Sequence, residues 1–169
     1  MKAECLACLN GPLLKRAGIW MALSFAVHLA WEVAQLPLYT LADESGGALA
    51  YAVLHCTAGD ALIAGGAYLL AAFALRESDW PVTRPWSGAI IVIPFGVIYT
   101  AWSEWDNVYR AGNWAYASGM PLVLGIGLAP LLQWIVVPAL VLVLVRGVRA
   151  PQNAARDPLN GNFQGDRHE

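Results

Sequence analysis

The sequence has few charged residues, few cysteines and no basic segment. Charged residues make up 13% of its 169 positions, whereas a soluble domain normally carries about 25%. Its three cysteines, Cys5, Cys8 and Cys56, cannot form a disulfide framework. The net charge of −2 leaves no basic surface for nucleic acid. The composition therefore argues against an ordinary soluble domain, a disulfide scaffold and a nucleic-acid-binding protein.

Long apolar runs take the place of these features. A helix needs about 20 mostly apolar residues to span a membrane, and four stretches qualify: 17–39, 51–75, 87–109 and 121–145. The connections 40–50, 76–86 and 110–120 are rich in Gly, Pro, Ser or charge, as loops should be. We predict an all-α, four-helix membrane bundle over residues 1–149. The polar segment 150–169, rich in Pro, Gly and Asn, is expected to be a disordered tail.

The basic residues indicate an orientation. Nine of the ten precede the first span, lie between the second and third, or follow the fourth, and only Arg110 lies on the other side. Basic residues are retained in the cytoplasm, so both termini should be cytoplasmic, in a multi-pass protein of the bacterial inner membrane. The N-terminal apolar segment shares features with signal peptides, but it lacks a convincing cleavage site, and we expect it to remain as the first span.

Two further patterns accompany the spans. Tryptophans lie near the expected span ends, which is typical of interfacial aromatic belts: Trp20, Trp80, Trp86, Trp105 and Trp114. Polar residues form stripes on the helical faces at spacings of three and four. They are Ser24, His28, Glu32, Gln35 and Tyr39 on span one, His55, Cys56 and Asp60 on span two, Thr100, Ser103, Glu104 and Asn107 on span three, and Gln133 on span four.

The stripes lie at similar depth. At about 1.5 Å per residue, each ionisable group inside the spans falls in the outer half of the membrane. Four antiparallel helices would then enclose one polar pocket, open outward or laterally to lipid. Buried charges cost at least about 2.5 kcal/mol each and often mark function. Asp106 lies off its stripe and is expected to be a solvated end residue.

Several functions remain open for such a pocket. The polar residues could simply hold the helices together. A metal site could use nitrogen and oxygen ligands from His28, Glu32, His55, Asp60 and Glu104, although no spacing is diagnostic. A small-ligand binding protein or a proton-coupled carrier could use the same pocket. A carrier would have little room for alternating access in four spans unless the chain forms a homodimer.

Acid–base chemistry on an apolar substrate fits the same residues. A carboxyl group in apolar surroundings stays protonated near neutral pH, and a neighbouring histidine can supply or receive the proton. The faces of Trp31, Trp102 and Trp134 could stabilise a cationic intermediate. Together these groups suit the movement of a C=C bond by proton addition and removal, with no cofactor and no metal.

The segments HLAWEVAQLPLY, IYTAWSEWDNVYRAG and QWIVVPALVLVLV together resemble the emopamil-binding protein (EXPERA-type) family of membrane sterol isomerases. HLAWEVAQLPLY resembles its H-L-x-x-E stretch, and IYTAWSEWDNVYRAG resembles the segment that begins Ile-Tyr and closes Arg-x-Gly. QWIVVPALVLVLV resembles its last helix, in which Trp is followed four residues later by Pro. The resemblance covers roughly residues 20–146. It implies a lipid-facing pocket in a helical bundle and a double-bond shift without cofactor.

The resemblance assigns residues but also departs from the family. It places His28 and Glu32 on the acid–base pair, Asp60 on an acidic residue of the next helix and Trp134 on the aromatic residue of the last. The family's Asn before that Trp is Leu131 here, and its acid after Ile-Tyr appears one turn later as Glu104. We also expect no counterpart of the family's extra leading helix. The Ala-Trp-Glu of span one also resembles transmembrane terpene cyclases of fungal meroterpenoid pathways.

We therefore expect a cofactor-independent isomerase or cyclase that acts on a sterol-like or isoprenoid lipid. Glu32 would donate the proton with His28 as its partner, and Asp60 or Glu104 would stabilise the cation or remove the proton. The substrate-binding residues would be Trp31, His55, Tyr99, Trp102, Asn107, Gln133 and Trp134.

Overall fold

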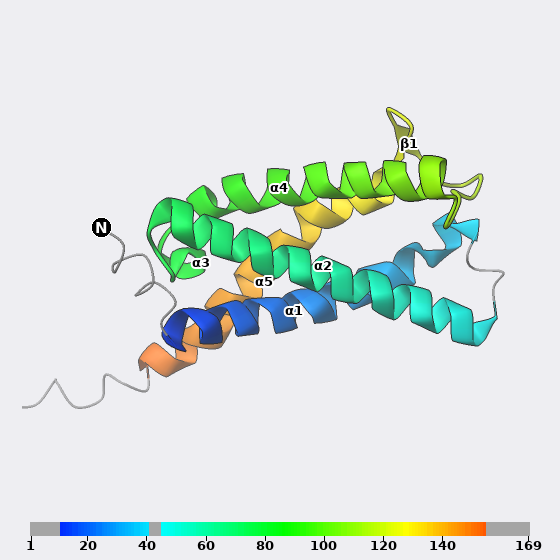
Figure 1. The fold of residues 1–169 in the computed structure, drawn as a ribbon. Helices are drawn as coiled ribbons and strands as arrows, with labels where there is room; N and C mark the ends of the chain where they lie inside the picture. Colours follow the sequence, from blue (N-terminus) through cyan, green and yellow to red (C-terminus); the bar gives the residue numbers. More distant parts are fainter. Residues whose placement is uncertain (1–10, 41–44, 155–169) are drawn as a thin grey trace, which may run out of the picture.

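Four long antiparallel helices form the molecule (Figure 1). The structure is a computed structural model that describes residues 11–40 and 45–154. The helices are α1 (Gly11–Gln35), α2 (Gly46–Leu75), α4 (Pro85–Trp105) and α5 (Leu128–Ala154). Helices α1 and α4 each pack against both α2 and α5, so the four close into a bundle. The all-α prediction is confirmed.

All four helices are long and apolar enough to span a membrane. Their candidate spans are Leu13–Leu38, Gly46–Leu75, Pro85–Ala111 and Leu128–Gly147. The number and order of the spans agree with the prediction, although their ends differ. Helix α1 gives way to a 3-10 turn, η1 (Leu36–Leu38), because Pro37 has no N–H to continue the helix. Helix α2 begins earlier than expected, where Ser45 caps it by accepting a hydrogen bond from the N–H of Ala48.

The fourth span is shorter at its start than predicted. Residues expected to begin it at 121 instead form a β-hairpin of β1 (Leu122–Val123) and β2 (Ile126–Gly127). Leu124 and Gly125 connect the strands with φ values of 52° and 85°, as a two-residue hairpin turn requires. Helix α5 also continues through the expected tail boundary to Ala154. The rest of that tail, 155–169, lies outside the described residues.

Two of the connections contain short helices. Helix α3 (Trp80–Thr83) lies within the expected loop 76–86. After α4 the chain continues as a π-helix, η3 (Asp106–Ala111), an arrangement that often occurs at functional sites. Asp106 pairs there with Arg110. This pair lies at the surface, so it does not contradict the expectation of a solvated end residue; one helical turn simply brings an opposite charge beside Asp106.

Aromatic packing fills the end of the bundle that contains α3. The rings of Trp20, Tyr68 and Trp80 lie with centroids 5.2–5.9 Å apart. Gly88 permits this packing, since a Cβ there would lie 1.8 Å from the Trp80 ring. Trp20 and Trp80 are fully buried, so their expected place in an aromatic belt is wrong. Apolar side chains fill the core at this end of the bundle, and the polar stripes of the four spans lie toward the other end.

Candidate active site

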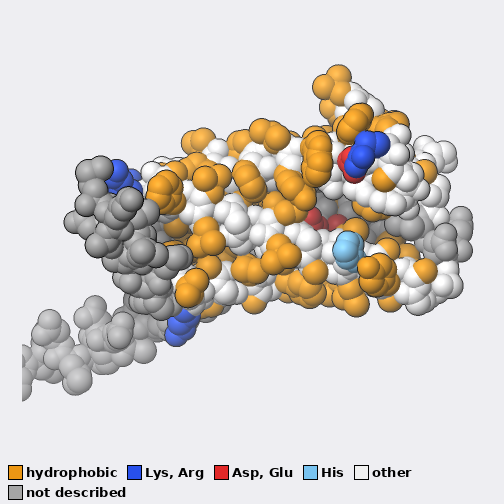
Figure 2. All heavy atoms as spheres, viewed as in Figure 1, with side chains coloured by type: hydrophobic (Ala, Val, Ile, Leu, Met, Phe, Trp, Pro, Cys, Tyr) orange, Lys and Arg blue, Asp and Glu red, His pale blue; other side chains and the backbone are white. Residues whose placement is uncertain are grey.

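A cavity lies within the bundle toward the end opposite α3. Its volume is about 450 Å³, within the range of about 300–1,000 Å³ typical of small-molecule sites. All four long helices line it. The lining residues are Glu32, Gln35, Leu36, Tyr39, Tyr51, Ala52, Val53, His55, Cys56, Gly59, Asp60, Ile63, Tyr99, Thr100, Ser103, Glu104, Asn107, Asn113, Trp114, Pro130 and Gln133. Figure 2 shows a hollow between α2 and α4 with acidic side chains at its bottom and a histidine at its rim. The cavity therefore opens through the side of the bundle.

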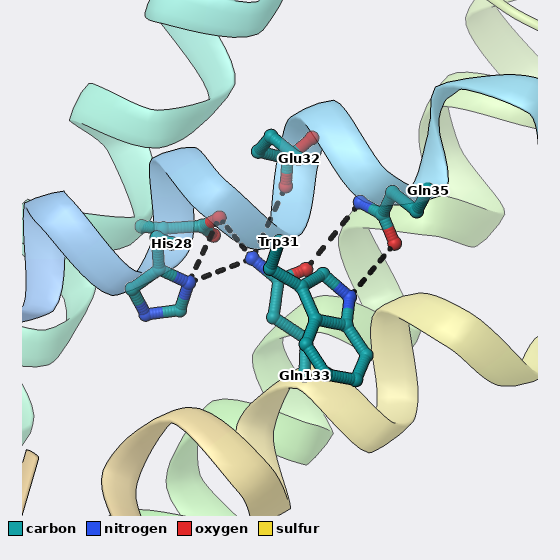
Figure 3. Close-up of polar contacts among 6 residues, drawn as sticks. His28, Trp31, Glu32, Gln35 and Gln133 are labelled. Atoms are coloured by element: carbon teal, nitrogen blue, oxygen red, sulfur yellow. Dashed lines mark hydrogen bonds and ion pairs between the residues drawn. The ribbon is translucent and has the colours of Figure 1, made fainter. Parts of the chain in front are cut away.

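The deepest polar group is an inner cluster of His28, Glu32, Asp60 and Gln133. Figure 3 labels three of its members, His28, Glu32 and Gln133. The amide Nε2 of Gln133 lies 2.6 Å from His28 Nδ1. The same nitrogen donates to Asp60 Oδ2 at 2.8 Å and to Glu32 Oε1 at 3.1 Å. His28 Nδ1 is also 3.4 Å from Asp60 Oδ2. Three helices thus bring two carboxyl groups and an imidazole around one amide nitrogen.

A second amide connects this cluster to a tryptophan. The indole Nε1 of Trp31 donates to Gln35 Oε1 at 3.1 Å. The Nε2 of Gln35 then donates to Gln133 Oε1 at 3.5 Å. Figure 3 shows the three side chains in sequence beside the inner cluster. The chain of hydrogen bonds ties the end of α1 to α5.

An outer cluster of Tyr39, Glu104 and Tyr116 lies nearer the end of the bundle. Both tyrosine hydroxyls donate to Glu104 Oε2, from Tyr39 at 3.2 Å and from Tyr116 at 2.8 Å. Backbone pairing positions them, because Thr40 N donates to Ala115 O and Ala117 N donates to Leu38 O, each at 3.0 Å. Burial, followed by the neighbouring Glu104 carboxylate, raises the pKa of Tyr39. Both hydroxyls therefore act as neutral donors.

The cavity contains carboxyl groups without cationic partners. Glu32, Asp60 and Glu104 line it, while no Lys or Arg is among the described residues that form its lining. Their partners are amides and hydroxyls, together with the imidazole of His28 beside Asp60 and the contact of Glu32 with Asp60. Carboxyl groups in such surroundings can take up and release protons, because no fixed positive charge holds them ionised.

Seven of the predicted site residues line the cavity. They are Glu32, His55, Asp60, Tyr99, Glu104, Asn107 and Gln133. His28 is completely buried and reaches the cavity only through its contacts with Gln133 and Asp60. No direct hydrogen bond joins it to Glu32, since the amide of Gln133 lies between them.

The three predicted tryptophans do not line the cavity. Trp134 is completely buried against Gly96, where a Cβ would lie 1.9 Å from its ring. Trp102 is 56% exposed on the outer face of α4. Trp31 is half-buried and binds Gln35. Helical spacing did not reveal these positions because it says nothing of how each helix is rotated toward its neighbours.

Sequence reasoning did not assign Gln35, Tyr39 and Tyr116 to the site. Gln35 and Tyr39 belong to the predicted stripe of span one, so their spacing offered a signal. Tyr116 lies in the segment 110–120 that was expected to be a loop. Its aromatic neighbours could suggest an interfacial role, but only the pairing of 115–117 with 38–40 places its hydroxyl on Glu104.

The inner cluster is not arranged as a metal site. Among the residues that the structure describes, no three His, Cys, Asp or Glu side chains are grouped to hold a metal ion. The inner carboxyl groups and the imidazole instead converge on the N–H group of Gln133, which is a donor and cannot serve as a ligand.

Comparison of the chain with protein-family models, curated proteins and solved structures gives no match.

Proposed function

We propose that the protein is a membrane-embedded, cofactor-independent isomerase or cyclase that acts on a sterol-like or isoprenoid lipid by adding and removing a proton. One observation carries the proposal: three carboxyl groups line a side-opening cavity that has no Lys or Arg in its lining. Moving a C=C bond by proton transfer needs a protonated acid shielded from water and a base nearby. The resemblance of the three segments to membrane sterol isomerases suggests the same chemistry.

The cavity would open to the outer half of the lipid bilayer. In this proposal the chain is a multi-pass protein of the bacterial inner membrane with both termini in the cytoplasm. Support comes from the basic residues of the described segments: Lys15, Arg16, Arg76, Arg84 and Arg146 lie at the α3 end, and Arg110 lies at the other. Basic residues favour the cytoplasmic side. The gap between α2 and α4 would then admit a substrate from the hydrocarbon.

The reaction needs only proton transfers. Glu32 gives a proton to one carbon of a C=C bond, and the adjacent carbon becomes cationic. A carboxylate of the cavity, such as that of Glu104, stabilises this cation through the low-polarity interior. The carboxylate of Glu104 or Asp60 then takes a proton from a neighbouring carbon and the shifted double bond forms, or attack by a second double bond closes a ring before that proton is taken. The proton taken from the site is returned to it, so the reaction balances without a cofactor.

Deuterium labelling tests the proposal directly. The purified protein in vesicles that contain sterol and isoprenoid lipids would be incubated in D₂O, and the lipids analysed by mass spectrometry. We expect deuterium on carbon in a lipid product with the wild-type protein. The Glu32→Gln variant should lose the label while it remains folded by circular dichroism. A label that persists in this variant, or lipid binding without any label in the wild type, would overturn the proposal.

A matched pair of glycine variants tests the location of the substrate. Gly59 lines the cavity, and a Cβ at Gly59 or at Gly66 of the same helix meets no atom within 4 Å. Gly66 does not line the cavity. We expect Gly59→Leu to fill part of the cavity and reduce labelling, while Gly66→Leu keeps it. Equal activity of the two variants would place the substrate elsewhere.

A further inference from the structure

The hydrogen bonds of Trp31, Gln35 and Gln133 fix the direction of both amides. An indole N–H can only donate, so the atom of Gln35 at 3.1 Å from Trp31 Nε1 must be the oxygen. The nitrogen of Gln35 then faces Gln133, which must present its own oxygen in return. The N–H group of Gln133 is thereby turned toward the inner cluster.

Counting hydrogens shows that the inner cluster needs one more proton. The Gln133 nitrogen carries two hydrogens, yet three groups lie within 3.1 Å of it: His28 Nδ1, Asp60 Oδ2 and Glu32 Oε1. Gln35 also donates to Glu32, so the two amides can supply all three groups, but the carboxyl groups of Glu32 and Asp60 also hydrogen-bond to each other. That bond needs a proton on one of the two, because a bare carboxylate can only accept.

The contacts of His28 show that its imidazole does not carry this additional proton. Its Nδ1 lies 2.6 Å from Gln133 Nε2, so an N–H on Nδ1 would point one donor at another. With the Gln133 amide in this direction Nδ1 accepts, which leaves the imidazole neutral with its hydrogen on Nε2, a buried atom that has no hydrogen-bond partner among the described residues. The extra proton then belongs to the carboxyl groups of Glu32 and Asp60, which also hydrogen-bond to each other. Two hydrogen-bonded carboxyl groups share a proton more readily than both ionise.

We propose that Glu32 and Asp60 hold one proton between them as the acid of this site, and that the Trp31–Gln35–Gln133 chain keeps it there by directing an N–H at His28 Nδ1. Gln35, Gln133 and Trp31 are positioning residues in this scheme, and His28 is the neutral acceptor that completes it. The use of this proton on a substrate rests on the proposed function, whereas its position does not.

Nitrogen-15 NMR of His28 tests the position of the proton without any substrate. The variant His55→Gln, His168→Gln leaves His28 as the one labelled histidine of the chain. We expect a protonated Nε2 and a bare Nδ1 in membranes. A protonated Nδ1, or an imidazolium signal, would overturn the proposal. Because no lipid product is measured, this failure is distinct from failure of the deuterium experiment.

Trp31→Phe tests the orienting chain. The change removes the indole donor that fixes Gln35 while it keeps an aromatic ring, so both amides can turn over. We expect a signal of protonated Nδ1 to appear on His28. Trp102→Phe is the matched control, because Trp102 lies on the exposed outer face, and it should leave the His28 signal unchanged. An unchanged His28 signal in both variants would show that the hydrogen bonds of Trp31, Gln35 and Gln133 do not have this orienting role.

Infrared spectroscopy distinguishes a shared proton from one that belongs to a single residue. A shared proton predicts that the band of the protonated carboxyl group is lost in Glu32→Gln and equally in Asp60→Asn. Loss in one variant alone would assign the proton to that residue and overturn the sharing. The Glu104→Gln variant should keep the band, because Glu104 has two hydroxyl donors of its own.

Discussion

The inner and outer clusters place the same chemical group in two different settings. Glu104 accepts hydrogen bonds from two tyrosine hydroxyls and has no second carboxyl group in its cluster. Glu32 instead shares an amide N–H with Asp60 and with the imidazole of His28. Donors alone favour a carboxylate, whereas a hydrogen bond between two carboxyl groups requires a proton on one of them. The partners of a carboxyl group, more than its depth in the bundle, decide whether it serves as base or acid.

The largest expected effect is on turnover, and it should differ between variants of the inner and the outer cluster. Glu32→Gln removes the proposed proton donor, and turnover should fall by at least about 100-fold. Glu104→Gln keeps the donor and weakens stabilisation of the cation, so its loss should be smaller. Rates of deuterium incorporation into lipid measure both. Equal losses of turnover in the two variants would contradict the proposal that Glu32 acts as the acid and Glu104 does not.

Stability should reveal the donors of the outer cluster. Tyr39→Phe and Tyr116→Phe each remove one hydrogen bond to the carboxyl group of Glu104, with an expected loss of about 1.5 kcal/mol in unfolding free energy. Tyr109→Phe is the matched control, since its hydroxyl donates to Gly125 O near the surface, and it should cost less. Denaturant unfolding in detergent micelles provides the measurement. A Tyr109 effect as large as the others would contradict the assignment.

Alkaline pH should weaken the outer cluster before the inner one. The pKa values of Tyr39 and Tyr116 are raised, chiefly by burial and also by Glu104. Their stabilising contribution is therefore present below the unfolded pKa of about 10 and is lost as the pH rises above it, because the unfolded chain releases these protons first. Unfolding midpoints measured from about pH 8 upward should fall less steeply in Tyr39→Phe. An identical slope would show that Tyr39 does not contribute.

The smallest effect concerns the hairpin beside the outer cluster. Leu124 is fully exposed and has a left-handed φ of 52°, a conformation that costs most residues about 1–2 kcal/mol. Asparagine adopts it more readily, so Leu124→Asn should raise stability by up to about 1 kcal/mol. The His28 NMR signal should stay unchanged, since the side chain of Leu124 is exposed whereas His28 is buried in the bundle. A lower melting temperature would show that the leucine side chain is needed there.

Local periodicity predicted much of this site. The stripe from Ser24 to Tyr39 follows from about 3.6 residues per turn, and that spacing alone puts His28, Glu32 and Gln35 on one helical face. The same argument placed Asp60, Glu104 and Gln133 at matching depth, and all three line the cavity. The start of α5 could not be found this way, because residues 121–127 are apolar enough to pass for helix yet turn at Leu124 and Gly125.

The sequence by itself determined that four apolar helices alternate in direction and carry their polar groups toward one end, because helix formation and spacing depend on neighbouring residues. Tertiary structure decided which of these groups meet. Trp134 fits over Gly96, and the neighbouring Gln133 lies between His28 and Glu32. Pairing of 115–117 with 38–40 brought Tyr116 to Glu104. Such contacts depend on the rotation and close approach of elements distant in the sequence, which no local pattern encodes.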